Sequence, residues 1–312
     1  LQGLLSLMCM AILLGRRDGN FEQDSGLKKS LPKSLKEGSL KAWLGLFWIA
    51  VLLIFAMGPL AAIFLDSFRK FEQGQWIYTL EWYSKLFSWS ENNQFLLSLW
   101  NSLLIGIGSA LLSSLCGLGL VSFIAYSKGL RRNLWEILTL FPLVLSTVVF
   151  GVAWFHFYQR HLTEIIPLIF VVIAMHALLT CPYWIRVVLP TLENIPKQWH
   201  SESKMLGKRP FEHGFRILWP WLRKTFLIAF FFSFSLSLGE LNSTMMIADE
   251  TVHTLPLEIY GAISGYRFSY ASAVGVILLL LSVSTFFVVE RSLEYFGTLK
   301  SVSYTHLRAH ET

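Results

Sequence analysis

The chain has 312 residues, of which 54% are hydrophobic and only 15% are charged, and its formal net charge is +6. Such a composition is typical of a protein built for a lipid bilayer rather than for water. The positive charge does not indicate nucleic-acid binding, because the sequence lacks long polar surfaces in which basic and aromatic residues alternate. Most Lys and Arg residues lie instead in the loops between apolar segments.

Six apolar segments are long enough to cross a membrane as helices, because a bilayer core of about 30 Å requires roughly 20 apolar residues in a helix. They are residues 42–65, 95–126, 135–158, 165–189, 224–248 and 269–289. Glu136, Arg186 and Glu240 lie within the third, fourth and fifth segments. We therefore expect an all-α integral membrane protein with six spanning helices.

Lys and Arg are concentrated in alternate loops between these segments. Cytoplasmic loops of membrane proteins carry an excess of these residues. This bias places residues 15–41, 127–134 and 190–223 and the C-terminus in the cytoplasm. The sequence thus predicts a multi-pass membrane protein with both ends in the cytoplasm.

The two ends of the chain differ from the part between them. Residues 1–14 are typical of the end of a preceding, truncated transmembrane helix, and residues 15–41 of a cytoplasmic linker. The six-helix domain then occupies residues 42–296, and residues 297–312 form a tail. The last 12 residues lose all hydrophobic periodicity and resemble a translated sequencing-adaptor tail, with a genuine disordered tail as the alternative.

A basic segment broken by glycine lies between the fourth and fifth predicted helices. Pro196 can open a short helix, because its missing N–H costs nothing at a first helical position, and Gly207 can end that helix. Pro210 can open a second helix, and Pro220 marks the start of the next span. Two short helices along the membrane would form a docking surface; a solvated amphipathic loop helix is the alternative.

This segment resembles the pattern E-A-A-x-x-x-G-x9-I-x-L-P of the permease subunits of binding-protein-dependent ABC importers. The stretch SESKMLG ends at Gly207, and Ile217 and Pro220 follow at the spacing of that pattern. Ser201 occupies the Glu position of the pattern, and Trp219 replaces its Leu. The resemblance covers about residues 40–296 and implies a six-helix type I importer permease domain in the bacterial cytoplasmic (inner) membrane.

The resemblance also implies a role for residues 196–220 as a coupling segment that seats in a dimer of a cytoplasmic ATP-binding subunit. The residues it assigns to this contact are Glu202, Lys204, Leu206, Gly207, Phe211, Ile217 and Pro220. Because the chain contains no GxxxxGK[ST] pattern, we expect the partner subunit to bind ATP. We expect this chain to be a transport subunit and no enzyme, with no cofactor or metal of its own.

Two further partners and the cargo are implied by the same resemblance. An extracytoplasmic solute-binding protein would deliver the cargo, and a second permease half would be fused upstream, which makes this chain the C-terminal half. The stretch from Gly239–Glu240 to TLPLEIY is similar to permeases of the ferric-iron, phosphonate and thiamine group. Ferric iron is the cargo expected first; thiamine, phosphonate and polyamine are alternatives.

Polar residues at membrane depth are costly, so they usually face a partner or a water-filled path. Glu240, Asn242, Ser243 and Thr244 are the candidate lining of a translocation path. A bond from Glu240 to a neighbouring helix or to the second permease half is an equally weighted alternative. In a different functional class, Glu240 would serve an ion-coupled secondary transporter or a membrane-embedded enzyme.

Other polar and small residues are expected to serve packing. His156 and His176 each stand alone on an apolar helix and are more often packing residues than ligands. Asn101 and Ser102, like Ser146 and Thr147, could line a path or bond across helices. The spacings Gly106/Ala110, Ser109/Ser113 and Ser113/Gly117 favour the close approach of a neighbouring helix.

Overall fold

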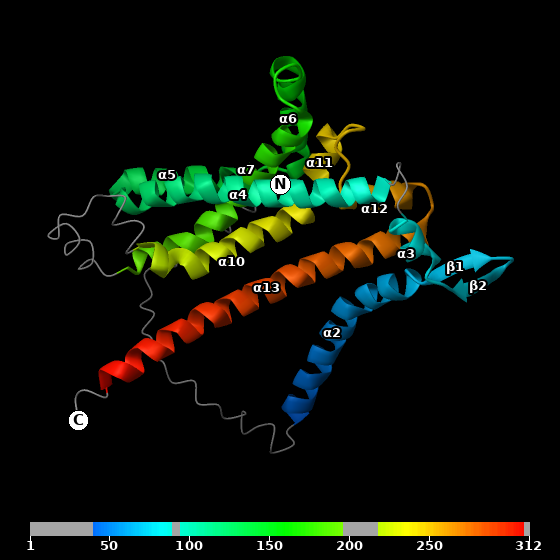
Figure 1. The fold of residues 1–312 in the computed structure, drawn as a ribbon, viewed down its shortest axis with the longest axis horizontal. Coiled ribbons are helices and arrows are strands. Elements are labelled where there is room, and N and C mark those ends of the chain that lie inside the picture. The colour runs from blue at the N-terminus through cyan, green and yellow to red at the C-terminus, as the bar shows by residue number, and fades with distance from the viewer. Residues whose placement is uncertain (1–39, 89–93, 196–217, 309–312) are drawn as a thin grey trace.

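The computed structural model describes residues 40–88, 94–195 and 218–308 (Figure 1). Its elements, in chain order, are α2 (Leu40–Asp66), β1 (Arg69–Glu72), β2 (Gln75–Tyr78), α3 (Glu81–Leu86), α4 (Gln94–Tyr126), α5 (Gly129–Val144), α6 (Thr147–His161), α7 (Leu168–Glu193), α10 (Trp219–Leu238), α11 (Asn242–Ile247), α12 (Leu255–Ser264) and α13 (Phe268–Arg308). The expected all-α membrane fold is confirmed, with one small antiparallel hairpin added to it. The predicted preceding helix 1–14 lies outside the described residues.

Five helices in the described ranges are long and apolar enough to cross a membrane: α2, α4, α7, α10 and α13. The pair α5 and α6 passes the same test only as one broken span, bent by 93°. The expectation of one continuous helix over 135–158 is therefore wrong. Pro142 lies in the last turn of α5, where its ring crowds the preceding turn, and Leu145 and Ser146 are extended.

A second predicted helix, 224–248, also ends early. α10 stops at Leu238, and the chain passes through Gly239 and Glu240 before the short helix α11 begins at Asn242. The position of Glu240 within a spanning helix, assumed from the sequence, is thus wrong. Glu240 lies in the break between two helices, which frees its side chain from the α10 surface.

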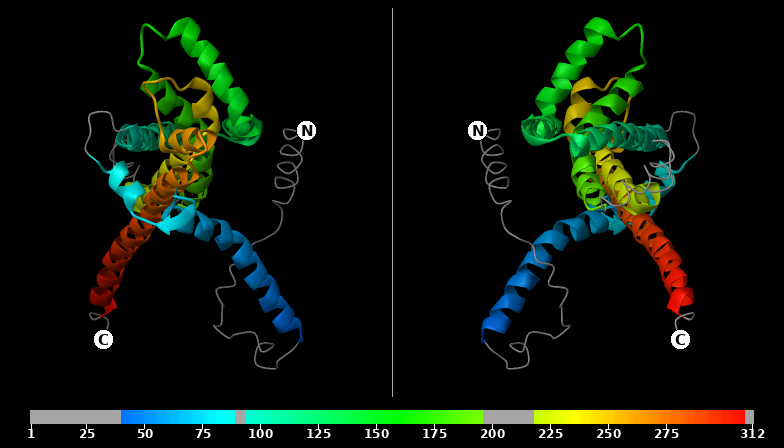
Figure 2. Two further views of the ribbon diagram at one scale, coloured as in Figure 1. Left: turned by 90° about the vertical axis from the view of Figure 1, so that its right-hand side faces the viewer. Right: turned by 90° about the vertical axis from the view of Figure 1, so that its left-hand side faces the viewer.

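The core is formed where α4, α7 and α10 run side by side, as Figures 1 and 2 show. The ring of Trp184 on α7 is fully buried against Gly117 of α4. A Cβ atom added at Gly117 would lie 2.2 Å from the Trp184 ring, and one at Gly106 would lie 2.8 Å from Phe234 of α10. The small residues of α4 therefore serve helix packing, as the sequence predicted.

The first span, α2, leans away from this core and meets the rest of the described chain mainly at α13 (Figure 2). None of its apolar 18-residue window is buried within the chain. A surface of this kind is stable in hydrocarbon, because lipid tails are as apolar as the side chains that they cover. The fold of α2 is thus consistent with a helix that the bilayer surrounds.

Polar residues near the start of α4 hold the loop before α12. The Leu255 N–H donates to the Ser102 hydroxyl at 2.7 Å, and the Asn101 amide donates to the Thr251 carbonyl at 3.3 Å. In the first turn of α12, Glu258 accepts a hydrogen bond from the Tyr270 hydroxyl of α13 at 3.0 Å. Of the two uses left open for Asn101 and Ser102, bonding across elements is the one observed.

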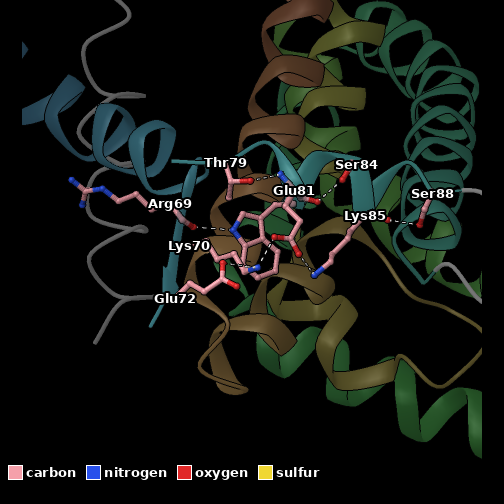
Figure 3. A network of polar contacts seen from close by, with 9 residues as sticks. Arg69, Lys70, Glu72, Thr79, Glu81, Ser84, Lys85 and Ser88 are labelled. Atoms are coloured by element: carbon pink, nitrogen blue, oxygen red, sulfur yellow. Dashed lines mark hydrogen bonds and ion pairs between the residues drawn. The ribbon is translucent and has the colours of Figure 1, made fainter. Parts of the chain in front are cut away.

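The hairpin β1–β2 is attached to α3 by the Lys70–Glu81 ion pair and a hydrogen bond, and Lys85 pairs with Glu81 within α3 (Figure 3). Lys70 and Lys85 each contact the Glu81 carboxylate at 2.6 Å, and the Trp82 indole N–H donates to the Arg69 carbonyl at 2.9 Å. The hydrogen bonds from Lys70 and then Lys85 lower the pKa of Glu81 to about 2. The carboxylate thus stays ionised in mildly acidic water.

Candidate functional site

The predicted coupling residues fall largely on a segment outside the described residues. This is true of Glu202, Lys204, Leu206, Gly207, Phe211 and Ile217. Pro220 is described and lies in the first turn of α10, where the sequence predicted the next span to begin. The roles assigned to the other six residues stay predictions.

The two helix ends that flank this segment lie together. The Thr191 and Thr225 hydroxyls, near the end of α7 and the start of α10, are 3.1 Å apart. Leu222 of α10 belongs to the same buried cluster as Val188 and Leu189 of α7. Residues 196–217 therefore connect two helix ends that pack against each other. We call the end of α7 and the start of α10 together the stem.

Glu240 caps α11 from the break that follows α10. Its Oε1 accepts hydrogen bonds from the Ser243 backbone N–H at 3.0 Å and from the Ser243 hydroxyl at 3.1 Å. An acidic side chain at a helix start satisfies N–H groups that have no partner within the helix. Both of these hydrogen bonds to the carboxylate are thus local and come from α11, not from a neighbouring spanning helix.

The other three predicted path residues differ in how much of their surface is exposed. Asn242 is exposed, whereas Ser243 and Thr244 are fully buried. The Thr244 hydroxyl donates to the Glu240 carbonyl at 3.3 Å and lies 2.7 Å from Nε2 of His176. Ser243 and Thr244 are therefore buried within the described chain and hold α11 in place, and their role in a path stays a prediction.

His176 joins three helices at this point. Its Nδ1 lies 2.7 Å from the Ser237 hydroxyl of α10, and its Nε2 lies 2.7 Å from Thr244 of α11, while His176 itself belongs to α7. The side chain is buried, with 1% of its surface exposed. His176 is thus a packing residue with both ring nitrogens engaged, as the sequence favoured. The bond to Thr244 could not be read from the sequence.

A cavity of about 150 Å³ lies beside His176, between the α5–α6 bend, α7 and the end of α10. Its polar lining consists of Thr147, His176, Thr180, Tyr183, Ser237 and Glu240. Its apolar lining comes from Pro142, Leu143, Leu145, Leu179 and Leu236. A cavity of this size with several hydrogen-bonding groups has room for water.

The structure brings one of the four predicted path residues, Glu240, to this cavity. Thr147, for which the sequence left path lining or helix bonding open, also lies on its wall. Thr180, Tyr183 and Ser237 were not singled out, because a single polar residue on an apolar helix carries no signal of which face it occupies. The break in α5–α6 opens the space that these side chains share.

Packing between α6 and α11 fixes the wall that carries Glu240. A Cβ atom added at Gly151 of α6 would lie 2.6 Å from the Ser243 carbonyl oxygen and 3.0 Å from Cβ of Met246. Only glycine allows the two helices to approach this closely. The position of Glu240 therefore depends on α6 as well as on α10.

Fold and sequence together define an inner-membrane transport subunit. Residues 111–296 match the family of binding-protein-dependent transport system inner membrane components, and the chain belongs to this family. The thiamine transport system permease protein ThiP of Brucella abortus is 27% identical over 195 residues, which are 61% of this chain and 35% of the relative. The chain thus spans about a third of the length of that relative.

Two other proteins extend the likeness over more of the chain. A Salmonella choleraesuis protein, PhnV, which carries the name of a 2-aminoethylphosphonate transport permease, is 23% identical over 82% of this chain and 96% of its own. A solved bacterial alginate ABC transporter in complex with a periplasmic protein has a TM-score of 0.66 at 16% identity. That likeness covers 82% of this chain and 94% of the solved chain. It extends the permease fold to the helices before residue 111.

Proposed function

We propose that this chain is a permease subunit of an ATP-driven importer. An extracytoplasmic binding protein delivers a solute to it, and a separate ATP-binding subunit seats on residues 196–220. Family membership supports the transport role, and the paired ends of α7 and α10 support a stem that carries this segment. A second permease half, predicted upstream, completes the path.

We further propose that the cargo is a small cation. The observation that carries this choice is the half-buried Glu240 carboxylate on the cavity wall. A carboxylate attracts a nearby cation and repels an anion, and this effect is stronger in an apolar surrounding than in water. A phosphonate group is an anion, so the cargo named for PhnV is disfavoured at this site.

Thiamine is the first candidate, because its thiazolium ring carries a permanent positive charge. The name of the ThiP relatives supports this choice. Ferric iron, the cargo expected first from the sequence, is also a cation and is the second candidate. Among the described residues, no group of three or more His, Cys, Asp or Glu side chains lies together as a metal site would require.

Uptake of labelled thiamine tests the role of Glu240. The permease, its ATP-binding subunit and its binding protein are reconstituted in vesicles with trapped ATP. Glu240→Gln keeps an acceptor for the Ser243 bonds and removes the charge, so we expect uptake to fall severalfold. Glu164→Gln, in the exposed loop between α6 and α7, is the control and should transport normally. Equal uptake by the two variants would contradict the proposed cation path.

Substitution at Gly207 tests the ATPase contact. A large side chain at this position would hold the partner surface away from the segment. We expect Gly207→Trp to abolish uptake and co-purification of the ATP-binding subunit while the permease stays in the membrane. Normal uptake by this variant would contradict an ATPase seat at residues 196–220.

A further inference from the structure

A single guanidinium group joins two helices beside the predicted coupling segment. Arg132, near the start of α5, donates from Nε to Glu136 Oε1 on its own helix at 2.9 Å. Its Nη2 contacts Glu193 Oε1, on the last residue of α7. One cation is thus shared by two carboxylates, one of them on another helix.

Glu193 stands only three residues before the coupling segment 196–220. The end of α7 is already fixed to the start of α10 by the contact between Thr191 and Thr225. The Arg132–Glu193 ion pair adds α5 to this stem. A displacement of the stem by the bound ATPase would therefore act directly on the start of α5.

The other end of α5 reaches the cavity. Pro142 and Leu143, in its last turn, line the cavity wall, and the 93° bend into α6 follows directly. The helix has 16 residues and no break between the ion pair and Pro142. A continuous α-helix rises about 1.5 Å per residue. A displacement of one end of α5 therefore reaches its other end. The same helix thus contacts the stem at one end and the cavity at the other.

The contribution of the Arg132–Glu193 ion pair to the free energy of folding does not account for its presence. The side chains of Arg132 and Glu193 are each 31% exposed, and ion pairs exposed to water contribute little to folding. α5 is also held by apolar packing, since the Trp135 ring meets Phe123 of α4 at 5.4 Å between centroids. The ion pair adds to this apolar packing a directional contact between the start of α5 and the end of α7.

We propose that Arg132 is a positioning residue for transport. Through Glu193 it transmits movement of the coupling segment to α5, and α5 then changes the cavity that contains Glu240. This inference rests on the proposed function, in which an ATPase seats on residues 196–220. Loss of the Arg132–Glu193 pair should separate ATP hydrolysis from transport without preventing assembly.

The test uses the reconstituted complex with trapped ATP and labelled thiamine, and it measures thiamine transported per ATP hydrolysed. We expect Arg132→Gln and Glu193→Gln to co-purify with the ATP-binding subunit and to hydrolyse ATP. Their transport ratio should fall about tenfold, within the usual range of coupling between two sites. Arg131→Gln, at the exposed neighbouring position, is the matched control and should keep the ratio of the unmodified protein.

The exchanged double variant, Arg132→Glu with Glu193→Arg, tests the ion pair itself. If the two residues had a merely structural role, exchanging their charges would not restore the thiamine transported per ATP hydrolysed. This variant again places one cation among carboxylates, with Glu136 still on α5, and should restore most of the ratio. An unchanged ratio in Arg132→Gln, or no recovery in an exchanged variant that assembles normally, would overturn the proposal. If the unmodified complex itself neither hydrolyses ATP nor transports, the proposed function fails and this inference fails with it.

Discussion

Nε2 of His176 lies 2.7 Å from the Thr244 hydroxyl and thereby joins α7 to the short helix α11. Thr244 is fully buried, and its hydroxyl also bonds the carbonyl of Glu240. This bond adds to the packing of α11 on α6, and together they fix the break after α10 to the core. The position of the Glu240 carboxylate at the cavity depends on this bond.

Replacing His176 should destabilise the protein. In His176→Leu the buried hydroxyls of Ser237 and Thr244 lose their shared partner. A buried polar group without a partner costs about 1–3 kcal/mol, so we expect a loss of that order. His156→Leu, at an exposed position of α6, should stay within about 0.5 kcal/mol. Thermal unfolding in detergent measures both, and equal midpoints would contradict a structural role for His176.

Gly117 should tolerate no side chain. In Gly117→Ala the new Cβ would lie 2.2 Å from the Trp184 ring, which is fully buried and has no room to retreat. Overpacking of this kind costs about 1–3 kcal/mol. Gly119→Ala is the control on the same helix, because a Cβ there has no atom within 4 Å. A lower unfolding midpoint is expected only for the first variant; a loss of the same size at Gly119 would assign the effect to the helix rather than to Trp184.

Gly151 should affect transport through the position of α11. The Cβ of Gly151→Ala would meet the Ser243 carbonyl oxygen at 2.6 Å and would push α11 away from α6. Because Ser243 donates to the Glu240 carboxylate, we expect thiamine uptake in the reconstituted complex to fall. Gly261→Ala, which has open space on α12, should transport normally. Unchanged uptake in Gly151→Ala would show that the α6–α11 contact has no bearing on the path.

The contact between the hairpin and α3 should survive mild acid. The pKa of Glu81 is lowered to about 2, so its ion pairs contribute fully above the ordinary value near 4.5 and are lost as the pH falls towards 2. In Lys70→Ala the largest cause of the shift is removed, and the pKa of Glu81 should rise towards its ordinary value. A carboxylate titration by NMR in lipid nanodiscs measures this. The same midpoint in both proteins would contradict the ion pair.

The spanning helices could be predicted from the sequence because apolar length alone determines which segments a bilayer accepts. The two breaks could not. At the first break, the apolar run continues through Leu145 and Ser146 without a charged residue. At the second break, it continues through Gly239, and Glu240 is the charged residue that follows. A hydropathy window does not register a change of backbone direction when composition stays constant.

The candidate site was predictable only where a residue is costly in lipid. Glu240 stands out in the sequence for this reason, and the structure brings it to the cavity. His176 and Thr180 of α7 meet Ser237 of α10 through helix packing, which local sequence does not encode. The coupling residues from Glu202 to Ile217 lie outside the described residues, so their roles rest on the motif alone.

ATP-dependent uptake tests the central claim most directly. The permease and its ATP-binding subunit are placed in sealed vesicles, with the binding protein and labelled thiamine outside. The account predicts uptake only when ATP is trapped inside and the binding protein is present. Uptake driven by an ion gradient without ATP would contradict it and would assign the chain, with Glu240, to the secondary transporters instead.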